Sequence, residues 1–361
     1  MDTYRKDAPS IRENREFKET SKKFGDGVIT AFADVSHALS LVDDLNETDR
    51  KRLEIFQSIF VRLNLLEKGP LLQVSVQFDP NLPDNEIGLF LKKGEALKTS
   101  KALSAEDDLF VAVAPSVLES VWELIRTEID KSGDDDIYAG ITFLEGLLNL
   151  NLEEDVMAGL TGEIALKVPN FMNFDPQALE NINIQVDANF QFDAGSVETD
   201  GAIIFNPTNR RKWNRIGNSL SNLQNVSISQ TDYNGITVSA VDSSIYYGEV
   251  KDLFLLGFSE EGVYKLVDSV KKDTQPSYLK RVPKTSVAFV QLNLARLLEA
   301  DAKGSPPADK VLVSSKEIAP LLAWISIDDS DATFEIVVSA EDTPLEAFAK
   351  HVPFYIWTLQ N

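Results

Sequence analysis

The chain has 361 residues, 57 of them acidic and 35 basic, which gives a net charge of −22 at pH 7. Such a surface repels the phosphates of nucleic acids and anionic lipids, which bind proteins through clustered lysine and arginine, so nucleic acid is excluded as a partner. Cysteine is absent, which excludes disulfides and thiolate chemistry, and no apolar run reaches the ~18–20 residues of a transmembrane helix.

The first 26 residues differ from the rest of the chain. Residues 1–26 carry charges of both signs and few apolar side chains, which predicts a polar tail or stalk. Their beginning contains no apolar signal region, so in an exported protein we expect Met1 to replace a removed signal or anchor. The remaining length indicates two α+β halves, residues 27–169 and 170–361.

Four apolar runs each lead into a sequence with helical spacing, which predicts four strand–helix units. The runs are Val28–Phe32, Leu109–Val113, Leu253–Leu256 and Val287–Val290. The turns that follow them contain good helix-starting residues, namely Asp34, Pro115–Ser116, Ser259 and Asn293.

Two further segments begin with the same Pro-Leu-Leu sequence and alternate in polarity. They are residues 69–79 and 319–328, and each predicts a hairpin whose second strand is Ile87–Leu91 or Phe334–Val338. Helical or mixed segments precede them at 49–66 and 309–316. These matching units predict an internal duplication.

The remaining strands and linkers complete the prediction. Strands are expected at 163–168, 182–192, 202–205, 236–241 and 245–247, a helix at 208–223, and linkers at 94–105, 131–136 and 301–308. Together these elements predict an α+β fold with antiparallel sheets and helices on one face, built from repeated strand–helix and hairpin units.

Several short segments carry a family resemblance. The segments Leu148–Val168, Tyr233–Val238, Asp252–Glu261 and Val282–Phe289 resemble an uncharacterised family of exported bacterial envelope proteins, known only as a domain of unknown function. The resemblance implies an extracytoplasmic location, periplasmic or envelope-associated. It implies no catalytic residues.

The sequence offers little for catalysis. Nucleophilic catalysis needs a base next to its nucleophile, and the chain has only two histidines, His37 and His351. The turn Gly257–Gly262 approaches the nucleophile elbow that presents a serine between a strand and a helix, but its second glycine is one position late. We interpret Ser259 as a helix cap. No catalytic residue and no cofactor is predicted.

One acidic turn is a weak candidate for calcium binding. Asp79, Asn81, Asp84 and Glu86 could supply oxygen ligands, although they lack the order of an EF-hand loop. The short turn with Asp328, Asp329 and Asp331 is similar. Aspartate and asparagine are also common in ordinary turns, which is the favoured interpretation.

One basic cluster stands out on the acidic chain. Arg210, Arg211 and Arg215 lie in the expected helix, with Arg211 and Arg215 on one face. They could bind an acidic protein partner or a phosphate-bearing ligand. The favoured alternative is an outer helix face whose charges balance acidic neighbours.

These observations predict a non-catalytic extracytoplasmic scaffold or interaction protein. The alternative is a carrier of an apolar or lipid-like small molecule in a cavity between sheet and helices. A hydrolase has the least support.

Overall fold

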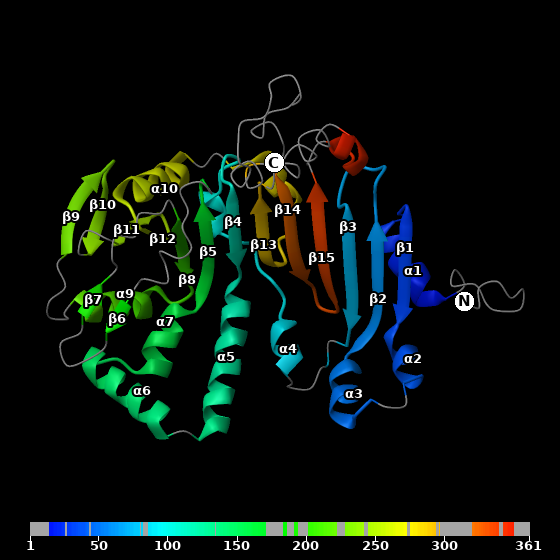
Figure 1. Ribbon diagram of the computed structural model, residues 1–361, viewed down its shortest axis with the longest axis horizontal. Helices are drawn as coiled ribbons and strands as arrows, with labels where there is room; N and C mark the ends of the chain where they lie inside the picture. The colour runs from blue at the N-terminus through cyan, green and yellow to red at the C-terminus, as the bar shows by residue number, and fades with distance from the viewer. Residues whose placement is uncertain are drawn as a thin grey trace, which may run out of the picture.

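The computed structural model describes residues 14–25, 27–42, 45–79, 81, 86–133, 135–170, 183–185, 191–193, 201–221, 228–241, 245–272, 275–293, 296, 320–338 and 342–349. Thirteen of the described strands form one sheet in which every neighbouring pair is antiparallel (Figure 1). This confirms the predicted α+β fold with an antiparallel sheet.

The order of the strands across the sheet differs from their order in the chain. From one edge to the other they are β1 (Ile29–Asp34), β2 (Phe56–Leu63), β3 (Leu72–Phe78), β15 (Asp331–Val338), β14 (Leu321–Ile327), β13 (Ser286–Leu292), β4 (Leu109–Val113), β5 (Gly162–Val168), β8 (Ala202–Pro207), β12 (Leu253–Gly257), β11 (Ile245–Val250), β10 (Ile236–Val241) and β9 (Ile228–Tyr233). A separate pair consists of β6 (Asn183–Gln185) and β7 (Gln191–Asp193). Because β5 pairs with β8, one sheet continues across the expected boundary between residues 169 and 170.

Most of the described helices connect these strands, while one precedes β1 and a short helix at 344–349 follows β15. The numbered helices are α1 (Arg15–Phe24), α2 (Val35–Ser40), α3 (Glu47–Leu53), α4 (Glu86–Phe90), α5 (Pro115–Ser132), α6 (Asp135–Leu148), α7 (Ala158–Leu160), α9 (Arg210–Ser221) and α10 (Glu260–Lys272), with 3-10 turns η3 (Thr99–Ala102) and η6 (Ser277–Arg281) and a π-helical turn η4 (Leu152–Met157). None of these described helices combines the length and the apolar character needed to cross a bilayer.

The strand–helix units follow the predicted pattern where the structure describes them. Strand β1 leads into α2, and the Asp34 side chain accepts a hydrogen bond from the backbone N–H of His37 at 2.8 Å. Strand β4 leads into α5, which Pro115 begins. Strand β12 leads into α10, where Ser259 Oγ accepts a hydrogen bond from the N–H of Gly262 at 3.0 Å. The interpretation of Ser259 as a helix cap is therefore confirmed.

The first of the two predicted hairpins is wrong. Residues 86–90 form helix α4 instead of a strand, and both edges of β3 are taken by β2 and β15, so β3 needs no strand from the segment that follows it. The second hairpin, β14 with β15, is confirmed. The internal duplication stays a prediction, since its unit at 309–316 lies outside the described residues.

Two other segments differ from expectation. Residues 49–66 hold the end of α3 and all of β2, a strand that we did not expect. The expected linker 94–105 contains η3, in which Thr99 and Ala102 are fully buried. The backbone N–H of Thr99 donates a hydrogen bond to the Glu163 carboxylate on β5, and Ala102 packs in the main hydrophobic cluster, so this segment is part of the core. The loop at 301–308 lies outside the described residues.

Part of the expected polar tail is docked on the sheet. Residues 15–24 form α1, whose Phe17 ring lies 5.8 Å from the ring of Phe32 and whose Phe24 ring stacks on Phe60 at 5.6 Å. Thr20, between them on the helix, is 1% exposed. Residues three and four positions apart share one helix face, so this mostly polar helix still presents an apolar contact surface.

The main core lies on one face of the sheet, which we call the covered face. Phe110, Phe289, Ile204 and Leu255 contribute fully buried side chains to it. Helix α10 packs on β10, β11 and β12 with buried side chains, and η3 packs on β5 and β8.

Candidate functional site

The opposite face of the sheet is apolar over eight neighbouring strands, from β1 to β5. The register shows this directly: Val111 on β4 lies opposite Val290 on β13, which lies opposite Ala323 on β14. Side chains at such paired positions point to the same side of a sheet. Following the register gives one continuous set of partly exposed side chains, which we call the open face: Ile29, Ala31, Ala33, Ile59, Val61, Leu63, Leu72, Val74, Val76, Ala332, Phe334, Ile336, Val338, Leu321, Ala323, Ile325, Ala288, Val290, Leu292, Leu109, Val111, Val113, Ile164 and Leu166. The register also places Ile327 and Val168 on this side, but they are 3% and 0% exposed and lie outside the open face.

Burial distinguishes the two faces along the same strands. On β14, Leu322 and Trp324 point to the covered face and are 1% and 3% exposed, whereas Ile325 on the open face is 39% exposed. On β1, the open-face residue Ile29 is 58% exposed. Every other residue of the open face is at least partly exposed. In Figure 1 no helix is drawn in front of β15, β3 and β2.

Helix α9 marks one border of the open face. The Trp213 ring lies 4.7 Å from Phe205 on β8 and 4.9 Å from Phe254 on β12. Phe205 pairs with Ile164, so it belongs to the same side of the sheet as the open face. Trp213 therefore covers this side beyond β5, while the open-face side chains from β5 to β1 stay at least partly accessible.

The chemistry of the open face is uniform. Its side chains are alanine, valine, leucine, isoleucine and one phenylalanine, none of which can donate or accept a hydrogen bond. The backbone groups of the inner strands are used in the sheet ladder. Eight strands spaced ~4.8 Å apart make the face about 34 Å wide. Apolar patches of this extent on a protein surface usually mark binding sites.

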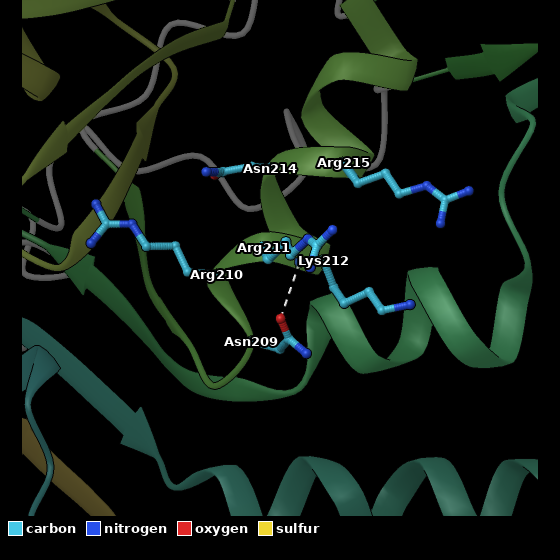
Figure 2. A pocket seen from close by; sticks show the side chains of 6 residues that line it. All are labelled: Asn209, Arg210, Arg211, Lys212, Asn214 and Arg215. Carbon is cyan, nitrogen blue, oxygen red and sulfur yellow. Dashed lines mark hydrogen bonds between the residues drawn. The ribbon is translucent and has the colours of Figure 1, made fainter.

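The basic cluster on α9 is largely neutralised by acidic neighbours. Lys212 Nζ and Arg215 Nη1 both contact Asp155 Oδ1, at 2.7 and 2.8 Å, and Figure 2 shows both side chains extending to the same side of α9. Arg210 extends the other way and pairs with Glu249 and Asp252. The residues Asn209, Arg210, Arg211, Lys212, Asn214 and Arg215 line an open depression of about 1040 Å³.

The electrostatics of this cluster centre on one buried carboxylate. The Asp155 side chain is 4% exposed, and its pKa is lowered mainly by the hydrogen bond from Lys212 and then by the backbone N–H of Asn151. Among the described residues, Arg211 has no acidic partner. This arrangement favours a charge-balanced helix face, and partner binding by Arg210, Arg211 and Arg215 stays a prediction.

Of the residues that form the calcium candidate, the structure describes the side chains of Asp79 and Asn81, which lie together in one turn. Asp79 Oδ1 accepts hydrogen bonds from the N–H and the side-chain amide of Asn81, at 2.9 and 3.3 Å, as in an ordinary turn. Asp84 and the side chain of Glu86 lie outside the described residues, as does His351. In the part of the chain that is described, no three acidic or histidine side chains gather into a metal site. Calcium binding stays a prediction.

Sequence reasoning missed two buried charged groups on the covered face. Lys167 on β5 pairs with Asp107 at 3.1 Å. Glu163, also on β5, accepts hydrogen bonds from the N–H groups of Lys98 and Thr99 at 2.6 and 2.7 Å, and from the Thr99 hydroxyl. Burial raises the pKa of both carboxyls. Both groups attach the segment before β4 to the sheet, which gives them a structural role.

The open face was also missed, although the sequence carried a signal for it. Leu109–Val113, Val287–Val290 and Leu321–Ile325 are apolar at consecutive positions, which is typical of strands with two apolar faces. A strand with one face in water alternates instead. The runs predicted strands correctly, but they could not show that no described helix covers the second face.

Comparisons with known proteins add nothing on function. No family model and no curated protein matches the chain. Two crystal structures of TP0453, a Treponema protein of uncertain function, are similar to it. Crystal form I is 9% identical, with 64% of this chain and 75% of that chain covered and a TM-score of 0.29. Crystal form III is 7% identical, with 70% and 85% covered and a TM-score of 0.31. Similarity this low carries no argument.

Proposed function

We propose that the protein is a non-catalytic extracytoplasmic interaction protein that binds an apolar partner through the open face. The observation that carries this proposal is the continuous set of at least partly exposed apolar side chains from β1 to β5. Leaving so much apolar surface in water costs free energy, at ~25 cal/mol per Å². A partner that removes this surface from water recovers that free energy.

Three observations support the location and the lack of catalysis. A chain of 361 residues without cysteine suits an oxidising compartment, because it cannot form wrong disulfides there. The resemblance to exported envelope proteins points the same way. Ser259, the residue closest to a nucleophile motif, is engaged as a helix cap.

A carrier of an apolar or lipid-like molecule is the second candidate function. The aliphatic lining of the open face favours it, because such a surface suits hydrocarbon. Extraction of the purified protein followed by mass spectrometry would find a lipid in constant ratio to protein if the protein is a carrier.

The proposal is tested with Nile red, an uncharged dye whose fluorescence rises on apolar surfaces. We expect the folded full-length protein to bind the dye and Ile325→Glu to weaken binding strongly, because it places a charge in the middle of the open face. The matched control is Ile125→Glu on α5, which makes the same change at a side chain that is 45% exposed and off the sheet. No dye binding by the wild type, or equal loss in both variants, would contradict the proposal.

A further inference from the structure

We infer that the apolar partner is the hydrocarbon of a bilayer of zwitterionic phospholipid, on which the open face docks. This inference rests on the proposed function and names the occupant of the open face. Three properties support it: the absence of hydrogen-bonding side chains on the open face, the width of that face, and the negative charge of the whole chain.

The absence of polar groups argues against a protein partner. Protein interfaces carry about one hydrogen bond per 100–200 Å² and a polar rim around an apolar centre. The open face contains no side chain that can form a hydrogen bond, from Ile29 at one edge to Ile164 and Leu166 at the other. A polar group of a protein partner placed on it would lose water without gaining a new hydrogen bond, which is unfavourable. Acyl chains have no polar groups to satisfy.

The shape of the face favours an extended apolar phase over a single small molecule. Sites for small molecules are concave and enclose most of the ligand surface. The open face instead extends about 34 Å across eight strands, and among the described helices α9 borders it beyond β5. Covering its whole width takes many acyl chains side by side, which a bilayer provides.

The charge of the chain selects the kind of lipid. The net charge of −22 repels anionic headgroups, which would have to approach the protein during docking. It also disfavours a second copy of this chain, which carries the same charge. In the basic cluster on α9, Arg210, Lys212 and Arg215 already form ion pairs with acidic side chains of this chain, namely Asp155, Glu249 and Asp252. These ion pairs weaken the attraction of the cluster for an anionic surface. Zwitterionic headgroups avoid this repulsion.

The test is flotation of the full-length protein with phosphatidylcholine vesicles. We expect the wild type to float with them and Ile325→Glu to reduce the bound fraction about tenfold or more, since the loss of one buried isoleucine alone is worth about a factor of ten. Ile125→Glu should float like the wild type. Vesicles containing equal amounts of phosphatidylcholine and phosphatidylglycerol should bind less protein at low salt and regain binding as salt screens the repulsion.

Dye binding, flotation and light scattering together separate the inference from the proposed function. If the wild type binds Nile red but does not float, the inference is overturned and the interaction function stands. If light scattering shows a dimer that Ile325→Glu dissociates, the occupant is a second copy, which also overturns the inference. If neither dye nor vesicles bind, the proposed function fails as well. Should Ile325→Glu fail to fold, Ile325→Thr replaces it, because threonine suits a strand and adds a polar hydroxyl.

Discussion

Lys167 and Asp107 form an ion pair in which each side chain is only 4% exposed, with Nζ and Oδ2 3.1 Å apart. Lys167 Nζ also donates a hydrogen bond to the carbonyl of Ala102 at 2.7 Å, and Asp107 accepts one from the N–H of Ser104 at 2.6 Å. Since Lys167 belongs to β5 and the other residues precede β4, the pair fastens that segment to the covered face.

Replacing Lys167 with methionine should destabilise the protein strongly. The variant keeps the size of the side chain but leaves Asp107 buried without a cation, and removing one partner of a buried pair typically costs ~3–5 kcal/mol. The double variant Lys167→Met/Asp107→Asn should recover much of this loss, because no unpaired charge remains. Urea unfolding at pH 7 measures both. A loss equal in the single and double variants would show that the ion pair is not the cause.

The pH dependence of Lys167→Met follows from the pKa of Asp107. Burial raises this pKa, while Lys167 opposes the rise, so the variant should raise the pKa further. A raised carboxyl pKa means that the folded state prefers the protonated form, and this stability is lost as pH increases through the folded pKa. The destabilisation should therefore be smaller near pH ~4, around the ordinary aspartate pKa, than at pH 7. An equal loss at both pH values would contradict the role of Asp107.

Ser259→Ala should lower the free energy of unfolding by about 1 kcal/mol, because the N–H of Gly262 loses its acceptor at the start of α10. Ser259→Asp should keep or slightly raise stability, since aspartate also caps and its charge suits the positive end of the helix dipole. Thermal unfolding of the two variants measures the difference. If Ser259→Ala melts like the wild type, the cap contributes no stability.

Asp155→Asn should lower the melting temperature at neutral pH, because Lys212 and Arg215 would lose their shared carboxylate. The pKa of Asp155 is lowered in the folded state, so its stabilising effect is present above the unfolded pKa and is lost as pH falls through the folded pKa. Wild type and variant should therefore converge in acid. Glu154→Gln removes the neighbouring exposed carboxylate and is the control. A constant difference at all pH values would refute this assignment.

Phe24→Ala should release α1 from the sheet in part, because the ring stacks on Phe60, which is 1% exposed. We expect a loss of about 1–3 kcal/mol, as for a side chain that is incompletely buried, together with faster proteolysis within residues 15–24. Lys18→Ala, an exposed position on the same helix, should have little effect. If Phe24→Ala leaves both stability and proteolysis unchanged, this segment behaves as the polar tail that its composition suggested.

The sequence by itself determined the elements that depend on near neighbours. The runs Leu109–Val113 and Leu253–Leu256 predicted β4 and β12, and Asp34 and Ser259 predicted helix starts, because alternation and capping involve residues within about four positions of each other. The α+β class followed from the same local patterns. Composition also determined the net charge of −22, which disfavours nucleic acid as a partner, and the absence of cysteine, which excludes disulfides.

Only the tertiary structure decided which strands became neighbours and which surface stayed accessible. Val74 lies beside Phe334 because β3 pairs with β15, and no local pattern links residues so far apart in the chain. The pairing of β14 with β15 placed Ile325 beside Phe334 on the open face. The docking of α1 placed Phe24 against Phe60. An apolar side chain in a strand indicates only that burial is favourable. Whether a helix, another strand or an outside partner buries it depends on how distant segments pack.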